Sequence, residues 1–222
     1  MEKLYIMMNE IIIGKNPKID DNVIIGYLSK SGGKKTRIGD NCIIRSGTVI
    51  YAGTIIGENF QTGHNALIRE NCHIGKNVSV GSGSIVEYGV DIGDNVRIHS
   101  NSTIVAYSKL EPHCFIGPNV VFANVLHPKC SKAEECAKIE APRIMSFAKI
   151  GAGSTILPGV VIGDHVLVGS GSVVIKSVPR MSVVVGNPAK IIKQIDELIC
   201  KHKWVEHLYD LNKDDELLNN LY

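Results

Sequence analysis

The chain has 222 residues, a formal net charge of +2 and only 5% aromatic residues. A near-neutral charge without a dense basic run interleaved with aromatics argues against a nucleic-acid partner. The sequence contains no run of about 18 apolar residues, and residues 1–13 lack the pattern of a signal peptide, so we expect a cytoplasmic protein with no membrane partner.

The first predicted elements are two six-residue units that begin at Ile13, each with a short strand and a turn. A polar segment, residues 27–37, then breaks the phase of this repeat. Its run from Ser31 through Gly33 has the composition of an exposed loop.

The main array runs from Ile38 to Val121 and repeats every six residues without interruption. The first position is Ile, Leu or Val in thirteen of the fourteen units, and the fourth is Asn or Gly in twelve. Asn and Gly tolerate the positive φ of a tight turn, and the aliphatic position is buried. Ordinary β-hairpins could also use such turns, but hairpins rarely keep one spacing over so many units. The repeat therefore predicts an all-β solenoid, a parallel β-helix in which coils stack to bury their apolar faces.

Three units for each triangular coil would make residues about 18 apart stack on one corner. This register places His64 in one column with Ser82 and Ser100. Asn65 and Asn101 lie in the column beside it.

A second break, residues 122–149, is rich in charge and contains His127-Pro128. A loop of this length in a compact protein is usually functional or disordered. The register predicts that it leaves the coil beside the corner of His64. The phase returns at Ile150 and ends near Pro179.

From Lys190 onward the apolar residues Ile191, Ile192, Ile195, Leu198 and Ile199 follow helical spacing. This pattern predicts a C-terminal α-helix that covers the open end of the solenoid. We therefore divide the chain into a β-helix domain, residues 1–187 with loops at 27–37 and 122–149, and a helical tail, residues 188–222.

Cys42, Cys72 and Cys114 occupy the fifth position of their units, where small apolar residues also occur. They are expected to be buried free thiols. The sequence contains no CxxC pair, the spacing that would suggest a zinc site, and we expect no metal site.

The six-residue units, the long loop and the ending Gly186-Asn187-Pro188-Ala189-Lys190 resemble the left-handed β-helix (hexapeptide-repeat) acyltransferases. This resemblance implies a left-handed homotrimeric prism, acetyl-CoA or another short acyl-CoA as co-substrate, and active sites between subunits. Residues 60–70, with Thr62-Gly63-His64 and Ile68-Arg69-Glu70, resemble N-acetyltransferases of nucleotide-linked amino sugars, and so do residues 116–124. His127-Pro128 departs from that subfamily. It is similar to the loop of galactoside and maltose O-acetyltransferases, in which the histidine is the general base.

Acyl transfer to an amine requires a group that removes a proton from the ammonium, and a neutral histidine suits this step. His127 and His64 are the two candidates for the base, and each could instead be an ordinary loop or turn residue. The predicted substrate-binding residues are Asn65, Glu70, Glu87, Asp94, Asn101 and Asn124. The predicted coenzyme contacts are backbone groups of the last coils and two lysines for the phosphates, namely Ala148, Gly151, Gly169, Ser170, Lys176 and Lys190.

The sequence thus predicts an acyl-CoA-dependent N-acetyltransferase of a dTDP- or UDP-linked amino deoxysugar in cell-surface glycan biosynthesis. One alternative is an O-acetyltransferase of a simple sugar or of serine. Another is a non-enzymatic solenoid scaffold, which would not need the His127 loop or the basic ending at Lys190.

Overall fold

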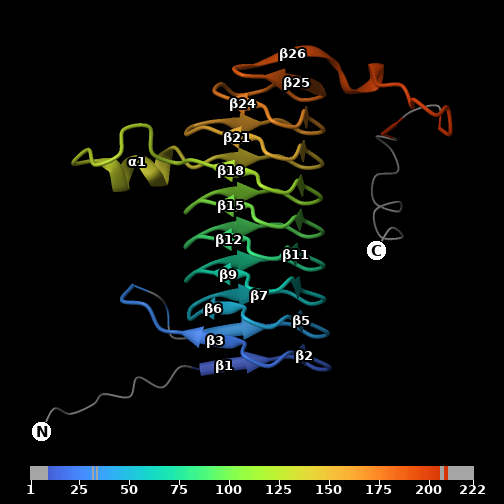
Figure 1. Cartoon of the computed structure of the whole chain (residues 1–222). Helices are drawn as coiled ribbons and strands as arrows, with labels where there is room; N and C mark the ends of the chain where they lie inside the picture. Colours follow the sequence, from blue (N-terminus) through green and yellow to red (C-terminus); the bar gives the residue numbers. More distant parts are fainter. Residues whose placement is uncertain (1–9, 32, 34, 206–207, 210–222) are drawn as a thin grey trace, which may run out of the picture.

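The protein is a left-handed parallel β-helix, drawn in Figure 1 from a computed structural model that describes residues 10–31, 33, 35–205 and 208–209. Short strands stack into three parallel sheets, which form the three faces of a triangular prism. Each strand pairs with the strand 18 residues further along the uninterrupted array, as in the pair of Ile74 with Ile92. The predicted 18-residue coil is therefore confirmed.

The first face contains eight strands: β1 (Glu10–Ile13), β4 (Lys35–Ile38), β7 (Ile55–Ile56), β10 (His73–Ile74), β13 (Asp91–Ile92), β16 (Lys109–Leu110), β19 (Arg143–Ile144) and β22 (Val161–Ile162). The second face contains ten: β2 (Lys18–Ile19), β5 (Ile43–Ile44), β8 (Gln61–Thr62), β11 (Ser79–Val80), β14 (Arg97–Ile98), β17 (Phe115–Ile116), β20 (Lys149–Ile150), β23 (Leu167–Val168), β25 (Ser182–Gly186) and β26 (Ala189–Gln194). The third face contains eight: β3 (Ile24–Tyr27), β6 (Val49–Tyr51), β9 (Leu67–Ile68), β12 (Ile85–Val86), β15 (Thr103–Ile104), β18 (Val121–Phe122), β21 (Thr155–Ile156) and β24 (Val173–Val174).

The corners between faces are the tight turns that the sequence predicts. We call the corner between the first and second faces the first corner, the next the second corner, and the corner between the third and first faces the third corner. Every fourth position of the fourteen units has positive φ, from Asn41 at 58° to Asn119 at 57°. The aliphatic first positions point inward and form one continuous buried core. Cys42, Cys72 and Cys114 are buried free thiols, as predicted.

Two excursions interrupt the coils, and both leave from the third corner, on the same side of the prism in Figure 1. The shorter one, residues 28–34, joins β3 to β4. The longer one, residues 123–142, joins β18 to β19 and contains the helix α1 (Ala133–Ile139). Both are shorter than predicted, because Lys35 already pairs in β4 and Ile144 already lies in the core at 0% exposure.

The prediction of a C-terminal α-helix is wrong for the residues that the structure describes. Residues 189–194 form β26, which pairs antiparallel with β25 and extends the second face, and only a 3-10 turn, η1 (Ile195–Glu197), follows. The hairpin supplies hydrogen-bond partners for the last open strand edge, which is the role that the sequence predicts for a helix. None of the helices in the described residues has the length and apolar character needed to cross a bilayer.

Candidate functional site

Most of the predicted site residues fall on two corners of the prism, the two that border the third face. On the second corner lie His64, Asn65, Asn101, Gly151, Gly169 and Ser170. On the third corner or its long excursion lie Glu70, Glu87, Asn124, His127 and Lys176. A two-residue strand of the third face separates the two groups within one chain, so one copy does not bring them together.

His64 is held on the second corner by the residues above and below it in its column. Its Nδ1 lies 2.9 Å from Ser46 Oγ, and its backbone N–H donates to Ser82 Oγ at 3.0 Å. When Nδ1 carries the proton and donates to Ser46, the Nε2 lone pair is available as a base. The ring is exposed to solvent, so a substrate could reach it.

The second corner becomes bare toward the C-terminal coils, where it is built from Gly, Ala and Ser. A Cβ added at Gly153 or Gly171 would meet no atom within 4 Å. A thin ligand could therefore approach the backbone closely here. The predicted contacts need correction, however, because the N–H groups of Gly151 and Gly169 donate to Val168 and Val184 within the solenoid.

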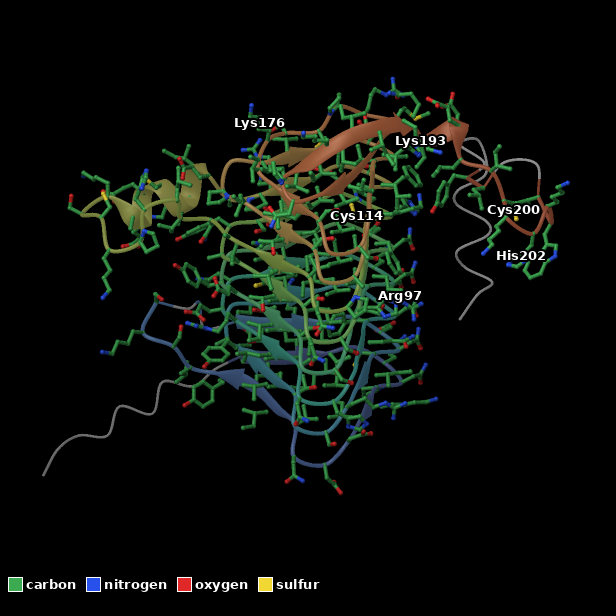
Figure 2. All side chains as sticks on the ribbon, turned by 45° about the horizontal axis from the view of Figure 1, so that its top comes forward. Arg97, Cys114, Lys176, Lys193, Cys200 and His202 are labelled. Atoms are coloured by element: carbon green, nitrogen blue, oxygen red, sulfur yellow. The ribbon has the colours of Figure 1, made fainter. Side chains whose placement is uncertain are left out.

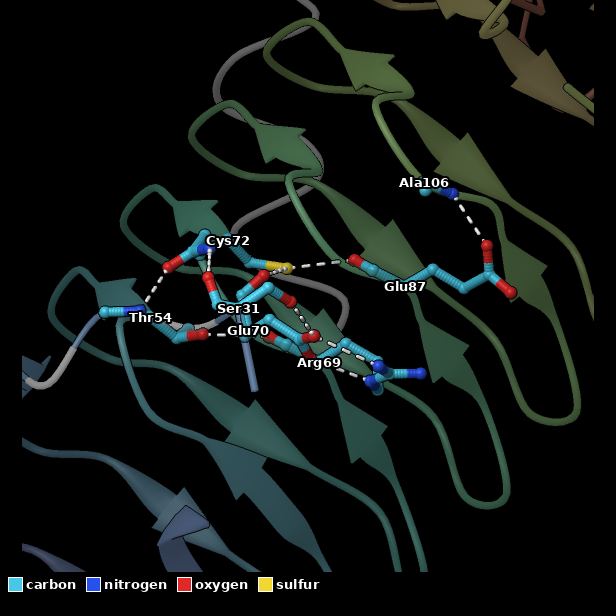
Figure 3. A network of polar contacts seen from close by, with 9 residues as sticks. Ser31, Thr54, Arg69, Glu70, Cys72, Glu87 and Ala106 are labelled. Atoms are coloured by element: carbon cyan, nitrogen blue, oxygen red, sulfur yellow. Dashed lines mark hydrogen bonds and ion pairs between the residues drawn. The ribbon is translucent and has the colours of Figure 1, made fainter. Parts of the chain in front are cut away.

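The third corner carries the polar network of Figure 3, centred on a pair of adjacent charged residues. Arg69 donates from Nε to Glu70 Oε2 at 2.8 Å and from Nη2 to Glu70 Oε1 at 3.1 Å. Glu70 is 3% exposed. Burial raises the pKa of its carboxyl, but the hydrogen bonds and charge of Arg69 outweigh burial and hold that pKa below its usual value.

The short excursion rests on this network. Ser31 Oγ donates to Glu70 Oε1 at 3.4 Å, and the N–H of Gly33 donates to Asn71 Oδ1 at 2.8 Å. Asn71 Nδ2 in turn donates to the carbonyl of Ser31 at 3.3 Å. Glu70 therefore lies beneath a loop, so it positions Arg69 and this loop and is not an open substrate contact as predicted.

Glu87 is the half-buried carboxylate next to this pair. Its Oε2 accepts the N–H of Ala106 at 2.8 Å, and its carbonyl accepts Cys72 Sγ at 3.0 Å (Figure 3). Burial raises the pKa of the Cys72 thiol to about 12, which makes this thiol inert. Asn124, at the start of the long excursion, donates to the carbonyl of Ala106 at 3.0 Å. His127 is exposed further along that excursion, which leaves from the third corner and not from beside His64.

Three predicted residues lie elsewhere. Asp94 is on the first corner, where its carboxylate accepts the N–H of Lys76 at 2.8 Å. Ala148 is also on the first corner, and its carbonyl and N–H are both used within the solenoid. Lys190 is exposed on β26 of the terminal hairpin. Figure 2 shows Lys176 on the side of the prism from which α1 projects.

Sequence reasoning missed Arg69 as a site residue, and it missed the tyrosines around it. The Arg69 guanidinium carbon lies 5.0 Å from the ring centroid of Tyr51 and 5.8 Å from that of Tyr88. The 18-residue register could have placed Tyr51, Arg69 and Glu87 in one column, since they are 18 apart.

Sequence reasoning also missed a hollow of about 450 Å³ on the first face, lined by His73, Asp91 and Lys109 among others. His73 Nδ1 and Lys109 Nζ lie 3.4 and 3.5 Å from the carboxylate oxygens of Asp91. Such exposed cross-strand pairs contribute little to stability.

Two models of hexapeptide-repeat proteins match the chain. "Bacterial transferase hexapeptide (six repeats)" matches residues 53–88, 89–124 and 141–176, and "Hexapeptide repeat of succinyl-transferase" matches residues 35–60. Together they cover more than half of the sequence. The chain belongs to the hexapeptide-repeat transferases.

Two acetyltransferases are similar to shorter stretches of the chain. A 2,3,4,5-tetrahydropyridine-2,6-dicarboxylate N-acetyltransferase of Clostridium perfringens is 42% identical over 99 residues, covering 44% of this chain and 37% of that protein. Serine acetyltransferase 2 of Arabidopsis thaliana is 48% identical over 65 residues, covering 28% of this chain and 20% of that protein. The chain thus matches less than half the length of these relatives.

Among solved structures, a UDP-N-acetylglucosamine acyltransferase of Bacteroides fragilis superposes with a TM-score of 0.57 at 15% identity. The superposition covers 85% of this chain and 71% of that one. At this identity the likeness shows the fold alone.

Proposed function

We propose that the protein transfers an acetyl group from acetyl-CoA to the amino group of a nucleotide-linked amino sugar. Its membership of the hexapeptide-repeat transferases and the acetyltransferase names of its relatives support the acetyl transfer. The resemblance of residues 60–70 and 116–124 to the amino-sugar enzymes supports the acceptor.

The working unit in this proposal is a trimer built around the third face. Each of its eight strands has an outward Ile, Val, Leu or Thr, namely Ile24, Val49, Leu67, Ile85, Thr103, Val121, Thr155 and Val173. The outward residues at the ends of β3 and β6, Tyr27 and Tyr51, are uncharged as well. The outward positions of the first face, by contrast, include Lys35, Arg37, Asp91, Lys109 and Arg143. An uncharged face is the one whose burial against other copies costs least.

A three-fold arrangement also completes the site. When the third face of each copy points toward the axis, the second corner of one copy meets the third corner of its neighbour around the ring. His64 of one copy then faces Glu87 and the long excursion of the next. The observation that carries the proposal is that most of the predicted site residues lie on the two corners that border the uncharged third face.

In the reaction, the ammonium of the acceptor first loses a proton. With that proton released to solvent, the neutral amine attacks the thioester carbonyl and the N–C bond forms. The attacking nitrogen, now positively charged, gives up a second proton, the C–S bond breaks, and the coenzyme thiolate takes up that second proton. In this proposal His64 receives the second proton from the nitrogen and passes it to the sulfur, and Glu87 attracts the ammonium. The bare second corner of the last coils suits the pantetheine arm, and Lys176 suits a coenzyme phosphate.

The test is a thiol-release assay with acetyl-CoA across a panel of nucleotide-linked 3-amino and 4-amino sugars. The panel also contains galactosides, serine and a tetrahydropyridine dicarboxylate. Turnover with a nucleotide-linked amino sugar supports the proposal. Turnover with serine or a simple sugar alone would instead establish an O-acetyltransferase, which the similarity to serine acetyltransferase favours as the second candidate. Coenzyme binding without any turnover would contradict both.

A further inference from the structure

A column of aromatic rings and cations runs along the third corner. The rings of Tyr27 and Tyr51 lie 5.0 Å apart between centroids. Arg69 follows between Tyr51 and Tyr88, at 5.0 and 5.8 Å from their rings. Tyr88 meets Tyr107 edge to face at 5.3 Å.

The column joins the two excursions. It begins at Tyr27, the last residue before the short excursion, and ends where Lys138 of α1 lies 5.8 Å from the ring of Tyr107. Four of the five tyrosines in the described part of the chain belong to it, and Tyr209 is the fifth. Tyr27 is 50% exposed, and the other three rings are half-buried. Aromatic surface therefore remains open to a ligand between the two excursions.

Tyr107 occupies a position at which a tyrosine is unfavourable. Its φ is 65°, in the left-handed region, where the equivalent turns use Gly53, Asn71 and Gly89. The turn itself gains nothing from a bulky residue in this conformation. Such an outlier is a reason to look for a function.

The coil below is shaped to accept this ring. A Cβ added at Gly89 would lie 3.1 Å from Cδ1 and 3.2 Å from Cε1 of Tyr107, so the ring lies directly over bare backbone. The ring thus depends on a glycine beneath it as well as on a strained backbone. Both features keep an aromatic side chain at this point of the corner.

From this arrangement we infer that the column of Tyr51, Arg69, Tyr88 and Tyr107 binds the nucleobase and diphosphate of the acceptor, an inference that rests on the proposed function. Tyrosine rings and a guanidinium plane are general stacking partners for bases. Arg69 uses Nε and Nη2 to hold Glu70 and is thereby fixed in one orientation. Its third nitrogen, Nη1, can meet a phosphate oxygen. In the proposed trimer the column lies on the corner that faces His64 of the neighbouring copy.

Tyr107→Asn tests this inference, because asparagine is the residue that the turn itself prefers. The ring is lost without harming the backbone, so Tm should stay unchanged or rise. Isothermal titration with UDP, dTDP and GDP should show binding about 10- to 100-fold weaker than in the wild type, the range expected for one lost stacking partner. Tyr107→Phe keeps the ring and should keep the affinity.

The matched control is His113→Asn, which makes the same change at another bulky turn residue of the array. His113 has φ 65° but lies on the first corner. Nucleotide affinity should not change in this variant. Unaltered nucleotide binding by Tyr107→Asn would overturn the inference.

Two further outcomes separate this inference from the proposed function. If the wild type acetylates a nucleotide-linked amino sugar and Tyr107→Asn has the same KM for it, the column is structural and only this inference fails. If the wild type binds no nucleoside diphosphate and acetylates a nucleotide-free acceptor, the proposed acceptor and the inference are both wrong.

Discussion

The buried carboxylate of Glu70 allows one prediction to be developed in full. Glu70→Gln preserves the size of the side chain but removes the charge that accepts two hydrogen bonds from Arg69, at 2.8 and 3.1 Å. A hydrogen bond to a charged group contributes roughly 1.5–3 kcal/mol, and breaking a fully buried ion pair costs about 3–5 kcal/mol. The Arg69 side chain is 35% exposed and can turn toward water. We therefore expect a loss near the lower end, about 2 kcal/mol of unfolding free energy.

This loss should depend on pH in a defined direction. Because the pKa of Glu70 is lower in the folded chain than in the unfolded one, its charge stabilises the fold fully above the unfolded value of about 4.3. The contribution is lost as pH falls through the folded value. The gap between wild type and Glu70→Gln should therefore close in acid.

The assay is urea unfolding followed by circular dichroism, at a fixed protein concentration, at about pH 7 and at steps down to about pH 3. Gln61→Glu, an exposed change on the second face, is a control for altered charge alone. A gap under about 0.5 kcal/mol at neutral pH would show that the Arg69–Glu70 pair does not stabilise the fold. A gap that stays constant into acid would show that Glu70 acts through shape and not through charge.

Three further predictions follow from single features. Gly171→Ala should lower the unfolding free energy by about 1 kcal/mol, because the φ of 70° is the only penalty for the added Cβ. Gly83→Ala should lower it more, since its Cβ would also lie 2.5 Å from Asn101 Oδ1. Equal Tm values for the two variants would contradict this difference. Cys72, fully buried with its pKa raised to about 12, should resist iodoacetamide at about pH 8 while the exposed Cys130 reacts, as peptide mass spectrometry can determine. Lys176→Ala should raise the KM for acetyl-CoA by about 10- to 100-fold and leave that for the acceptor unchanged, and equal KM values for acetyl-CoA would remove this lysine from the site.

The repeat made the prism predictable because each unit repeats the same local rule. An aliphatic residue turns inward, and three positions later Asn or Gly takes the positive φ. The rule fails where a unit lacks its signature. Ile144 was missed because the turn after it uses Phe147, at φ 61°, where Asn or Gly would normally mark the unit.

The prediction of a helix was wrong for residues 190–194 because the spacing of Ile191, Ile192 and Ile195 fits a helix as well as a strand. The decisive term is long-range: the unpaired edge of β25 offers a row of hydrogen-bond partners to the segment that follows it. The local spacing of apolar residues carries no information about this pairing with a strand edge.

The site was only partly predictable for a related reason. The register correctly stacked His64 with Ser82, because stacking follows from a spacing of 18. It could not show that the short excursion folds over Glu70 or that Lys138 reaches Tyr107. Those contacts join segments of irregular length, whose paths the repeat does not determine.

In the proposed trimer each active site combines the second corner of one copy with the third corner of the next. Mixing two defective proteins tests it most directly. One carries His64→Asn on the second corner, and the other carries His127→Asn together with Glu87→Gln on the third-corner side. After joint refolding at equal amounts, random assembly should leave about a quarter of the sites with both corners intact.

The measurement is the acetyl-transfer rate of the refolded mixture, compared with each variant refolded alone and with the wild type. We expect recovery to about a quarter of the wild-type rate, well above either variant by itself. A mixture no more active than its two components would show that both corners must be intact in one chain, and would contradict a site shared between copies.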